Sequence, residues 1–425
     1  MPSPVQSAAA VSAAERTLMR QIRARMQREH TRIPDELDTD FNLARWCRAF
    51  DGDVEEIVSE LCYYLEARAA AGADTGDIDR LVHQHELPRR YIRYLPVSLM
   101  RDTPYNSNDD AIVFFQRISG FDFNEVLKML RMGDLLALFL VYHEYYLRLV
   151  LKHEAATGRM HSTQLILDLR DVSLMDYVNP LGAPLQALRC MAQISEKWFG
   201  DMGSRVFIVN PPAIMSVIWN IVKLVMTTRN QQKIVLIHKP QDLFKHISAN
   251  AIPRCYGGHL CDETGFGQRD TCSNKPAQVT PKLYYPVGRV FHGVPLSDAT
   301  AHSETIKNGQ TFTVLRSVTA AGQWLAYQFT TSNEIAFRVT FISSTTPDQP
   351  QKRTVLKPRI LFVTPKIAEE DAIEALADEG QFQLEFTNAT CWRAVHVQYT
   401  AVIRHSRPPP LPPVQHDPYF DAMCS

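Results

Sequence analysis

The first hundred residues place apolar side chains at the spacing of an α-helix. In the clearest run, apolar residues recur at positions i, i+3, i+4, i+7 and i+11: Val54, Ile57, Val58, Leu61 and Leu65. This repeat puts all five side chains on one face of a helix. Asp53 precedes the run, and Glu56 lies three residues after Asp53. The two residues resemble a capping box. The pattern predicts a helical N-terminal lobe over about residues 13–100.

Between residues 101 and 260, short apolar runs alternate with helical patterns. The strand candidates are AIVFFQRI (111–118), QLILDLRDV (164–172), RVFIV (205–209) and KIVLI (233–237). Residues 134–153 and 183–197 have the pattern of helices between these runs. Strands that alternate with helices are typical of a sheet with helical crossovers. An α/β domain is therefore predicted here.

The hydrophobic period changes to two after a polar stretch at 261–282, which we expect to be a linker. Four runs alternate apolar and polar residues: Leu325–Phe329, Ile335–Phe341, Phe382–Phe386 and Val395–Ala401. Alternation of this kind is typical of strands with one buried face. The pattern predicts an antiparallel β-sandwich over 283–404, followed by a proline-rich tail at 405–425.

Composition and charge narrow the possible functions. The 425 residues include 45 basic and 46 acidic ones, for a formal net charge of -1. The clustered basic excess of nucleic-acid-binding proteins is absent. The chain has no secretion-signal pattern at its start, and no apolar run approaches the roughly 20 residues that span a bilayer. Together with eight scattered cysteines, these features predict a cytoplasmic protein without a nucleic-acid partner.

The sequence contains no pattern typical of a catalytic or metal site. It has no G-x-S-x-G elbow, no P-loop and no G-x-G-x-x-G after a strand. The candidate metal ligands do not have the spacing of a zinc knuckle: they are Cys255, Cys261 and Cys272, with His259 nearby. His143 and Glu144 are adjacent in a predicted helix, so we interpret them as its polar edge and not as an acid–base pair. We therefore expect no enzyme and no metal.

One segment is apolar around its whole circumference. Residues 211–226 read PPAIMSVIWNIVKLVM, in which the two prolines can start a helix. A helix that is apolar on all sides is either buried in the core or faces an apolar partner such as a lipid. Both interpretations remain open. The candidate ligand contacts in the segment are Ile214, Ile218, Trp219, Val222 and Met226.

The stretch HISANAIPRCYGG (246–258) combines Pro253 with two adjacent glycines, Gly257 and Gly258. Proline pushes the residue before it out of helical geometry, and glycine permits positive φ and close backbone approach. The stretch is interpreted as the exit from a folded unit, and a phosphate-binding loop is the competing interpretation.

Several segments resemble consecutive parts of the CRAL-TRIO lipid-binding proteins. DTDFNLARWCRAFDGDVEE (38–56) is similar to the helical lobe of that family. The lipid-binding domain itself is matched by LILDLRDVS (165–173), RVFIVNPPAIMSVIWNIVKLVM (205–226) and KIVLIHKPQDLFKHISANAIPRCYGG (233–258). In that family the pattern L-x-K-x-I-x-x-x-x-[LI]-P-x-x-[YF]-G-G closes the domain. The resemblance implies that residues 246–258 are a domain terminus and not a phosphate loop.

The resemblance also implies a ligand site. Family members hold one hydrophobic molecule beneath a gate helix, which residues 214–226 match. Phospholipid-binding members use an acid and a lysine at positions that correspond to Asp201 and Lys233, for which an ordinary surface pair is the alternative. Phosphoinositide binders carry a basic pair where this chain has Phe50 and Asp51. Because charge-assisted contacts hold phosphates, this difference argues against phosphatidylinositol.

The β region resembles a GOLD (Golgi dynamics) domain on its closing strands, GQFQLEFTNATCWRAVHVQYTAVI (380–403). The implied function is to bind one hydrophobic ligand or phospholipid, without another cofactor, and to exchange or present it at cytosolic membrane surfaces, with peripheral membrane association. The alternative is an adaptor with a vestigial pocket that recruits partners through its GOLD domain and tail. In the tail, Arg407, Pro410 and Pro413 fit the SH3-binding motif R-x-x-P-x-x-P.

Overall fold

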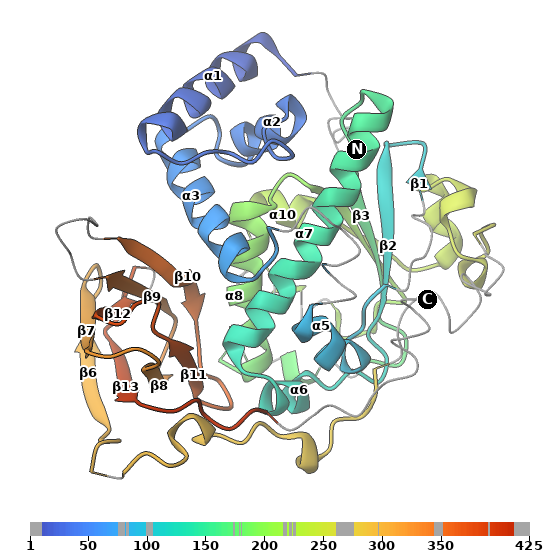
Figure 1. Ribbon diagram of the computed structural model, residues 1–425. Coiled ribbons are helices and arrows are strands. Elements are labelled where there is room, and N and C mark those ends of the chain that lie inside the picture. Colours follow the sequence, from blue (N-terminus) through green and yellow to red (C-terminus); the bar gives the residue numbers. More distant parts are fainter. Residues whose placement is uncertain are drawn as a thin grey trace.

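The computed structural model contains N-terminal helices, a mixed sheet with helices, and a β-sandwich (Figure 1). The structure describes residues 11–74, 81, 85–98, 105–172, 175–177, 179, 181–215, 219, 220, 223, 227–260, 276–295, 297–343, 352–389 and 392–411. The predicted fold class, a helical lobe followed by an α/β domain and an all-β sandwich, is confirmed.

The N-terminal helices begin at side-chain caps, of which the sequence pattern indicated the one at Asp53. Their bounds are α1 (Ala13–Arg28), α2 (Asp40–Ala49), α3 (Val54–Ala70) and α5 (Glu86–Tyr91), followed by the 3-10 turn η1 (Ile92–Tyr94). Ser12 and Glu15 form a reciprocal capping box at α1. The Asp53 side chain accepts the backbone N–H of Glu56 at the start of α3. These bonds satisfy backbone donors that have no partner within the helix.

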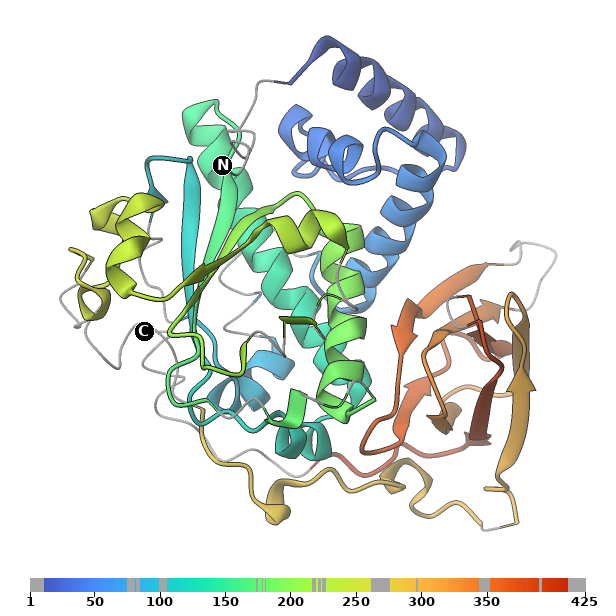
Figure 2. The ribbon, with the colours of Figure 1, turned by 180° about the vertical axis from the view of Figure 1, so that it is seen from behind.

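The central sheet has the strand order β1-β2-β3-β4-β5, in which β1 is antiparallel to β2 and the other pairs are parallel. Its strands are β1 (Tyr105–Asn106), β2 (Ala111–Arg117), β3 (Ser162–Asp168), β4 (Gly203–Val209) and β5 (Ile234–Ile237). The helices of this region are α6 (Phe123–Met129), α7 (Met132–Thr157), α8 (Ala183–Trp198) and α10 (Thr228–Gln232), with the turn η2 (Met175–Tyr177) before α8. Helices α7 and α8 lie on one side of the sheet (Figures 1 and 2).

The other face of the sheet is covered by the segment that includes three 3-10 turns, η4 (Pro240–Lys245), η5 (Ala249–Ala251) and η6 (Arg254–Tyr256). Gly257 ends η6 with a φ of 90°, a left-handed conformation that favours glycine. A Cβ on Gly258 would lie 2.0 Å from the carbonyl oxygen of Ile252. The backbone therefore requires glycine at both positions, at Gly257 for its positive φ and at Gly258 for a close approach to Ile252.

The β-sandwich consists of two antiparallel four-stranded sheets with the orders β10-β9-β12-β7 and β11-β8-β13-β6. The strands are β6 (His302–Ile306), β7 (Thr311–Val318), β8 (Trp324–Thr331), β9 (Ile335–Ser343), β10 (Arg353–Phe362), β11 (Glu369–Glu374), β12 (Gly380–Thr387) and β13 (Val395–Arg404). The turns η7 (Pro281–Leu283) and η8 (Arg289–Phe291) precede it. Buried aromatic rings fill the space between the sheets. The Phe337 ring, for example, lies 4.6 Å from Phe329 and 4.9 Å from Phe386 between ring centroids.

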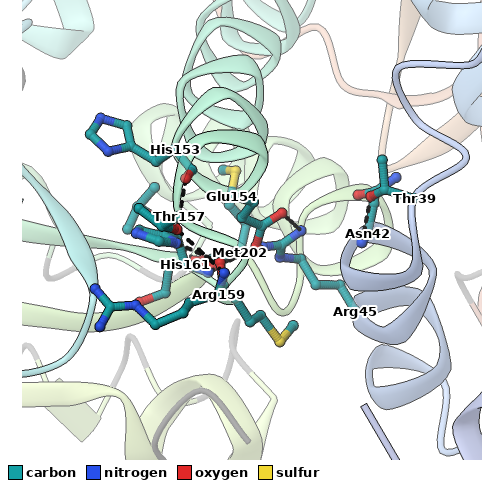
Figure 3. A network of polar contacts seen from close by, with 12 residues as sticks. Thr39, Asn42, Arg45, His153, Glu154, Thr157, Arg159, His161 and Met202 are labelled. Carbon is teal, nitrogen blue, oxygen red and sulfur yellow. Dashed lines mark hydrogen bonds and ion pairs between the residues drawn. The ribbon is translucent and has the colours of Figure 1, made fainter. Parts of the chain in front are cut away.

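A buried ion pair connects the N-terminal helices to the central domain (Figure 3). Arg45 in α2 pairs with Glu154 near the end of α7. The Arg45 guanidinium also donates to the backbone carbonyl of His161 at 2.8 Å, and the His161 N–H donates to the Glu154 carboxylate at 2.8 Å. Because both side chains are buried, each charge depends on the other for compensation. The network joins α2, α7 and the start of β3.

Glu144, in the middle of α7, differs from the sequence interpretation. It does not lie on a polar edge, because its side chain is fully buried. Its carboxylate accepts hydrogen bonds from the Tyr64 hydroxyl and from Arg68 Nε, the latter at 3.0 Å. Both partners belong to α3, and Arg68 also pairs with Glu36 at 2.8 Å. A buried carboxylate needs such partners, so the acidic residue marks a helix–helix contact.

The N-terminal end of α7 contacts β11 of the sandwich through charged residues. The Glu369 carboxylate accepts the backbone N–H of Gly133 at 2.8 Å. Arg131 donates to the backbone carbonyl of Glu370 and lies 3.6 Å from the Asp371 carboxylate. An acidic side chain at a helix N-terminus is favourable because the first backbone N–H groups point toward it. We call the four side chains of Arg131, Glu369, Glu370 and Asp371 the α7–β11 cluster.

Glu369 and Asp371, in the α7–β11 cluster, have pKa shifts in opposite directions. Burial raises the pKa of Glu369 to about 7, against the opposing effect of Arg131 and with an added contribution from Asp134. For Asp371, burial also acts to raise the pKa, but Lys357 and Arg131 outweigh it and lower the pKa to about 2. Glu369 therefore changes charge near neutral pH, whereas Asp371 stays ionised there.

We expect Glu369→Gln to stabilise the protein above neutral pH. The folded-state pKa of Glu369 lies above its ordinary value of 4.5, so its contribution to stability is present below about pH 4.5 and is lost as the pH rises through 7. The amide keeps an acceptor for Gly133 and carries no charge. The free energy of unfolding of the variant should exceed that of the wild type by on the order of 1–3 kcal/mol at pH 8, and the difference should shrink toward pH 5.

Urea unfolding of both proteins between pH 5 and pH 8 measures this difference. Glu374→Gln, on an exposed position of the same strand, is the matched control and should follow the wild type. A difference between Glu369→Gln and the wild type that does not change with pH would contradict the assignment.

Candidate ligand-binding cavity

A cavity of about 490 Å³ lies between the central sheet and helices α6, α7 and α8. Pockets for small molecules typically measure about 300–1,000 Å³, so this volume suits one compact ligand. The residues that line it are Leu95, Pro96, Val97, Gln116, Ile118, Phe121, Phe123, Leu135, Leu138, Phe139, Tyr142, His143, Tyr146, Leu167, Leu169, Tyr177, Leu188, Met191, Val206, Ile208, Met215, Trp219 and Ile234.

The strand register explains which sheet residues reach the cavity. Gln116 pairs with Leu167, and Leu167 pairs with Ile208, so these three residues form one row across β2, β3 and β4. All three line the cavity. Their neighbours Ile166 and Phe207 point to the opposite face, where they pack against the 240–260 segment. Period-two alternation thus gives the sheet one face toward the cavity and one buried face.

The segment 211–226 contributes to the cavity wall. Met215 and Trp219 line the cavity, and Ile214 packs in the same apolar cluster as Met215 and Tyr177. The Lys223 ammonium lies 5.6 Å from the centre of the Trp219 ring, a favourable cation–π distance. The other candidate contacts of this segment, Ile218, Val222 and Met226, lie outside the described residues.

Helix α7 supplies the polar side chains that the sequence analysis missed. Phe139, Tyr142, His143 and Tyr146 follow one another at i, i+3, i+4 and i+7, so they share one helical face, and all four line the cavity. His143 therefore faces the cavity and does not form a polar edge. The spacing was visible in the sequence, but the same spacing also describes an ordinary core helix.

His143 is neutral in this environment. Its Nδ1 lies 2.9 Å from the backbone carbonyl oxygen of Phe139. Burial lowers the pKa of His143 to about 4, despite the opposing effect of that hydrogen bond. Burial likewise raises the pKa of Tyr142 and of Tyr146, so both phenols stay protonated. The described residues that line the cavity include no lysine, arginine, aspartate or glutamate, so this part of the wall is uncharged.

Asp201 and Lys233 lie close to each other but not among the residues that line the cavity. Asp201 pairs with Arg229 at 2.5 Å, and Lys233 donates to the backbone carbonyl of Gly200. Burial lowers the pKa of Lys233 to about 8, with Asp201 acting in the opposite direction. Arg229 also donates to the backbone carbonyl of Arg48, so this polar group connects α10 to α2.

Phe50 and Asp51 lie in the connection between α2 and α3. The Phe50 ring stacks on Trp46, with 5.9 Å between centroids and 5° between planes. Asp51 has a φ of 49° and leads into the turn before α3. The aromatic residue thus has a structural role at the end of α2.

The described residues show neither a metal site nor a membrane-spanning helix. No group of three or more His, Cys, Asp or Glu side chains in the described ranges is arranged to hold a metal ion. Cys255 and His259 belong to those ranges, whereas Cys261 and Cys272 lie outside them. Among the helices that the structure describes, none is long and apolar enough to cross a membrane.

Residues 83–258 match the family model of the CRAL/TRIO domain. This part of the chain is therefore a CRAL/TRIO domain, generally a module that binds a hydrophobic ligand or lipid, and a β-sandwich region follows it. The match ends at Gly258, the second glycine of the HISANAIPRCYGG stretch.

Two curated relatives and one solved structure are similar to this chain. The CRAL-TRIO domain-containing protein C34C12.6 of Caenorhabditis elegans is 25% identical over 410 residues, which cover 94% of this chain and 98% of that protein. Protein real-time of Aedes aegypti is 24% identical over 223 residues, 51% of this chain and 33% of that protein. The crystal structure of Sfh5 covers 64% of this chain and 94% of its own, with 15% identity and a TM-score of 0.39.

We expect Val206→Phe to fill the cavity and to weaken the binding of apolar molecules at least tenfold. Val206 lines the cavity from β4, so a larger side chain there enters existing space and should cost less than the roughly 1–3 kcal/mol of overpacking a filled core. Titration with the neutral fluorescent dye N-phenyl-1-naphthylamine measures the binding.

Val235→Phe makes the same change on the opposite face of the neighbouring strand, where Val235 packs beside the 240–260 segment. This control should bind the dye like the wild type. Equal dye affinity of Val206→Phe and the wild type would show that the dye binds elsewhere.

Proposed function

We propose that the protein binds one hydrophobic lipid molecule in this cavity and exchanges or presents it at membrane surfaces. The observation that carries the proposal is the cavity itself, about 490 Å³ in volume with an apolar, uncharged lining, in a CRAL/TRIO domain. An apolar cavity of this size would surround the hydrocarbon part of a lipid with van der Waals contacts. The role is binding and transport and not catalysis.

The ligand contacts in this proposal come partly from the 211–226 segment: Ile214, Ile218, Trp219, Val222 and Met226. Opening this segment in water would expose large apolar side chains at roughly 1.5–3 kcal/mol each, so the closed form dominates in solution. A membrane surface accepts such side chains and shifts the population toward an open form. Asp201 and Lys233 would contact the head group only of ligands whose polar end extends beyond the cavity.

Exposed apolar residues support a membrane-contact face near this segment. Met175 and Leu181, on the connection between β3 and α8, are 64% and 74% exposed. Tyr177, between them in the sequence, lines the cavity and packs in the same cluster as Met215. Exposed large apolar side chains often mark interaction sites. We infer that Met175 and Leu181 contact the bilayer when the ligand is exchanged, which makes the association with membranes peripheral.

The second candidate function is an adaptor that recruits partners through its β-sandwich, which we propose is a GOLD-like domain. The exposed Trp392, at 77%, favours a partner contact on the sandwich. In the tail, the Arg407 guanidinium lies 5.8 Å from the centre of the Trp324 ring. SH3 binding through Arg407, Pro410 and Pro413 would therefore have to release Arg407 from the sandwich. Pro413 lies outside the described residues.

Native mass spectrometry of the purified protein tests the central proposal. We expect one lipid mass per chain, released on denaturation and absent from the Val206→Phe variant. A carrier must also give its lipid up to vesicles. If the wild type contains no lipid and takes none up from phosphatidylcholine vesicles, the carrier function is wrong and the adaptor function becomes the better explanation.

We expect Leu181→Asp to slow lipid transfer between vesicles at least fivefold and to leave the amount of bound lipid unchanged. The charge would oppose contact of the exposed loop with the bilayer, whereas Leu181 is not part of the cavity wall. The matched control is Leu315→Asp, on a 48% exposed position of strand β7 in the sandwich. Equal transfer rates for Leu181→Asp and the control would place the membrane contact on another surface.

A further inference from the structure

We propose that Tyr142, His143 and Tyr146 select a lipid with one uncharged hydroxyl group and reject lipids whose polar end is charged. The proposal rests on the function proposed above and specifies the chemical class of its ligand. We call these three side chains the α7 polar spot. They line an otherwise mostly apolar cavity from one helix, with ring centroids 6.4 Å apart for Tyr142 and Tyr146 and 6.0 Å apart for His143 and Tyr146.

The Tyr142 hydroxyl needs a partner. It is buried and has no hydrogen bond within the described part of the chain. Buried polar groups in folded proteins are nearly always hydrogen-bonded, and an unsatisfied one is costly. Replacing the hydroxyl by hydrogen would remove that cost, so its presence in an apolar wall indicates that a bound molecule supplies the partner. A phenol that stays protonated can donate to an oxygen of that molecule.

His143 adds an acceptor to the spot. The Phe139 carbonyl oxygen can only accept, so the Nδ1 of His143 carries the proton and donates to it. In the neutral ring, Nε2 is then an acceptor. The α7 polar spot therefore offers both a donor and an acceptor to the cavity. An alcohol both donates and accepts, whereas a carboxylate or phosphate only accepts.

Charged lipid ends find no compensation at this spot. Among the described residues, the cavity lining contains no cationic side chain, and an unpaired carboxylate or phosphate in such surroundings is strongly unfavourable. Two cations of the neighbouring polar group have other partners, because Arg229 pairs with Asp201 and Lys233 donates to Gly200. Neither of these cations lines the cavity. The same cavity that accepts an apolar body thus discriminates at its polar end.

A matched set of lipids tests the selection on the full-length protein. Hexadecane, 1-hexadecanol, hexadecanoic acid and hexadecyl phosphate share one apolar chain and differ only at one end. Each is delivered from phosphatidylcholine vesicles at pH 7.5, and the lipid that remains with the protein after gel filtration is quantified by mass spectrometry. We expect 1-hexadecanol to bind at least tenfold more tightly than the acid or the phosphate, and more tightly than hexadecane.

Variants locate the selection on α7. Tyr142→Phe and His143→Phe should each reduce the preference for 1-hexadecanol over hexadecane by about fivefold or more. Tyr145→Phe removes a hydroxyl from the same helix at a position that does not line the cavity, and should keep the wild-type preference. The comparison of the four lipids on the wild type itself needs no variant.

The possible outcomes distinguish a failure of this inference from a failure of the proposed carrier function. If the acid or the phosphate binds as tightly as the alcohol, or if both α7 variants keep the wild-type preference, the α7 polar spot does not select the ligand, while lipid binding as such stands. If none of the four lipids binds and no lipid accompanies the purified protein, both the inference and the carrier function are overturned.

Discussion

Buried charge holds helix α7 at three points along its length, and the rest of the structure depends on these attachments. Its N-terminal end contacts β11 through Arg131, which lies 3.6 Å from the Asp371 carboxylate. Its middle contacts α3 through Glu144, and its end contacts α2 through Glu154. Removing one partner of a buried pair typically costs about 3–5 kcal/mol, so such pairs fix position even where they add little net stability. One helix thus aligns the N-terminal lobe, the central sheet and the sandwich.

This alignment also explains how an apolar space can persist. A cavity lowers stability because its wall lacks contacts, and a flexible wall would collapse to recover them. Three attachments of α7 oppose that collapse, while Phe139, Tyr142, His143 and Tyr146 line the space from the same helix. The polar groups of α7 therefore divide by role: buried charges fix the helix, and neutral groups line the cavity.

The sequence predicts the regular elements well and the attachments poorly. Period 3.6 predicted the main helices, short apolar runs predicted four strands of the central sheet, and period 2 predicted the strands β8, β9, β12 and β13. Strand β6 reads HSETI and β11 reads EEDAIE, so their polar composition concealed them. The apolar circumference of the 211–226 segment marked it in the sequence as core or as a contact for an apolar partner. The partners of α7 could not be predicted, because Arg45 and Glu154 are 109 residues apart and no local pattern links them.

The distance along the chain between the two ends of one contact has a consequence for synthesis. Gly133 and Glu369 are 236 residues apart. At roughly 5–20 residues per second, a ribosome needs on the order of 10–50 s to make the intervening chain. During that interval the start of α7 exists without its carboxylate, and Arg131 without its partners on β11. The nascent CRAL/TRIO domain must therefore remain soluble with an incomplete first turn, and it reaches its final form only when the sandwich has left the ribosome.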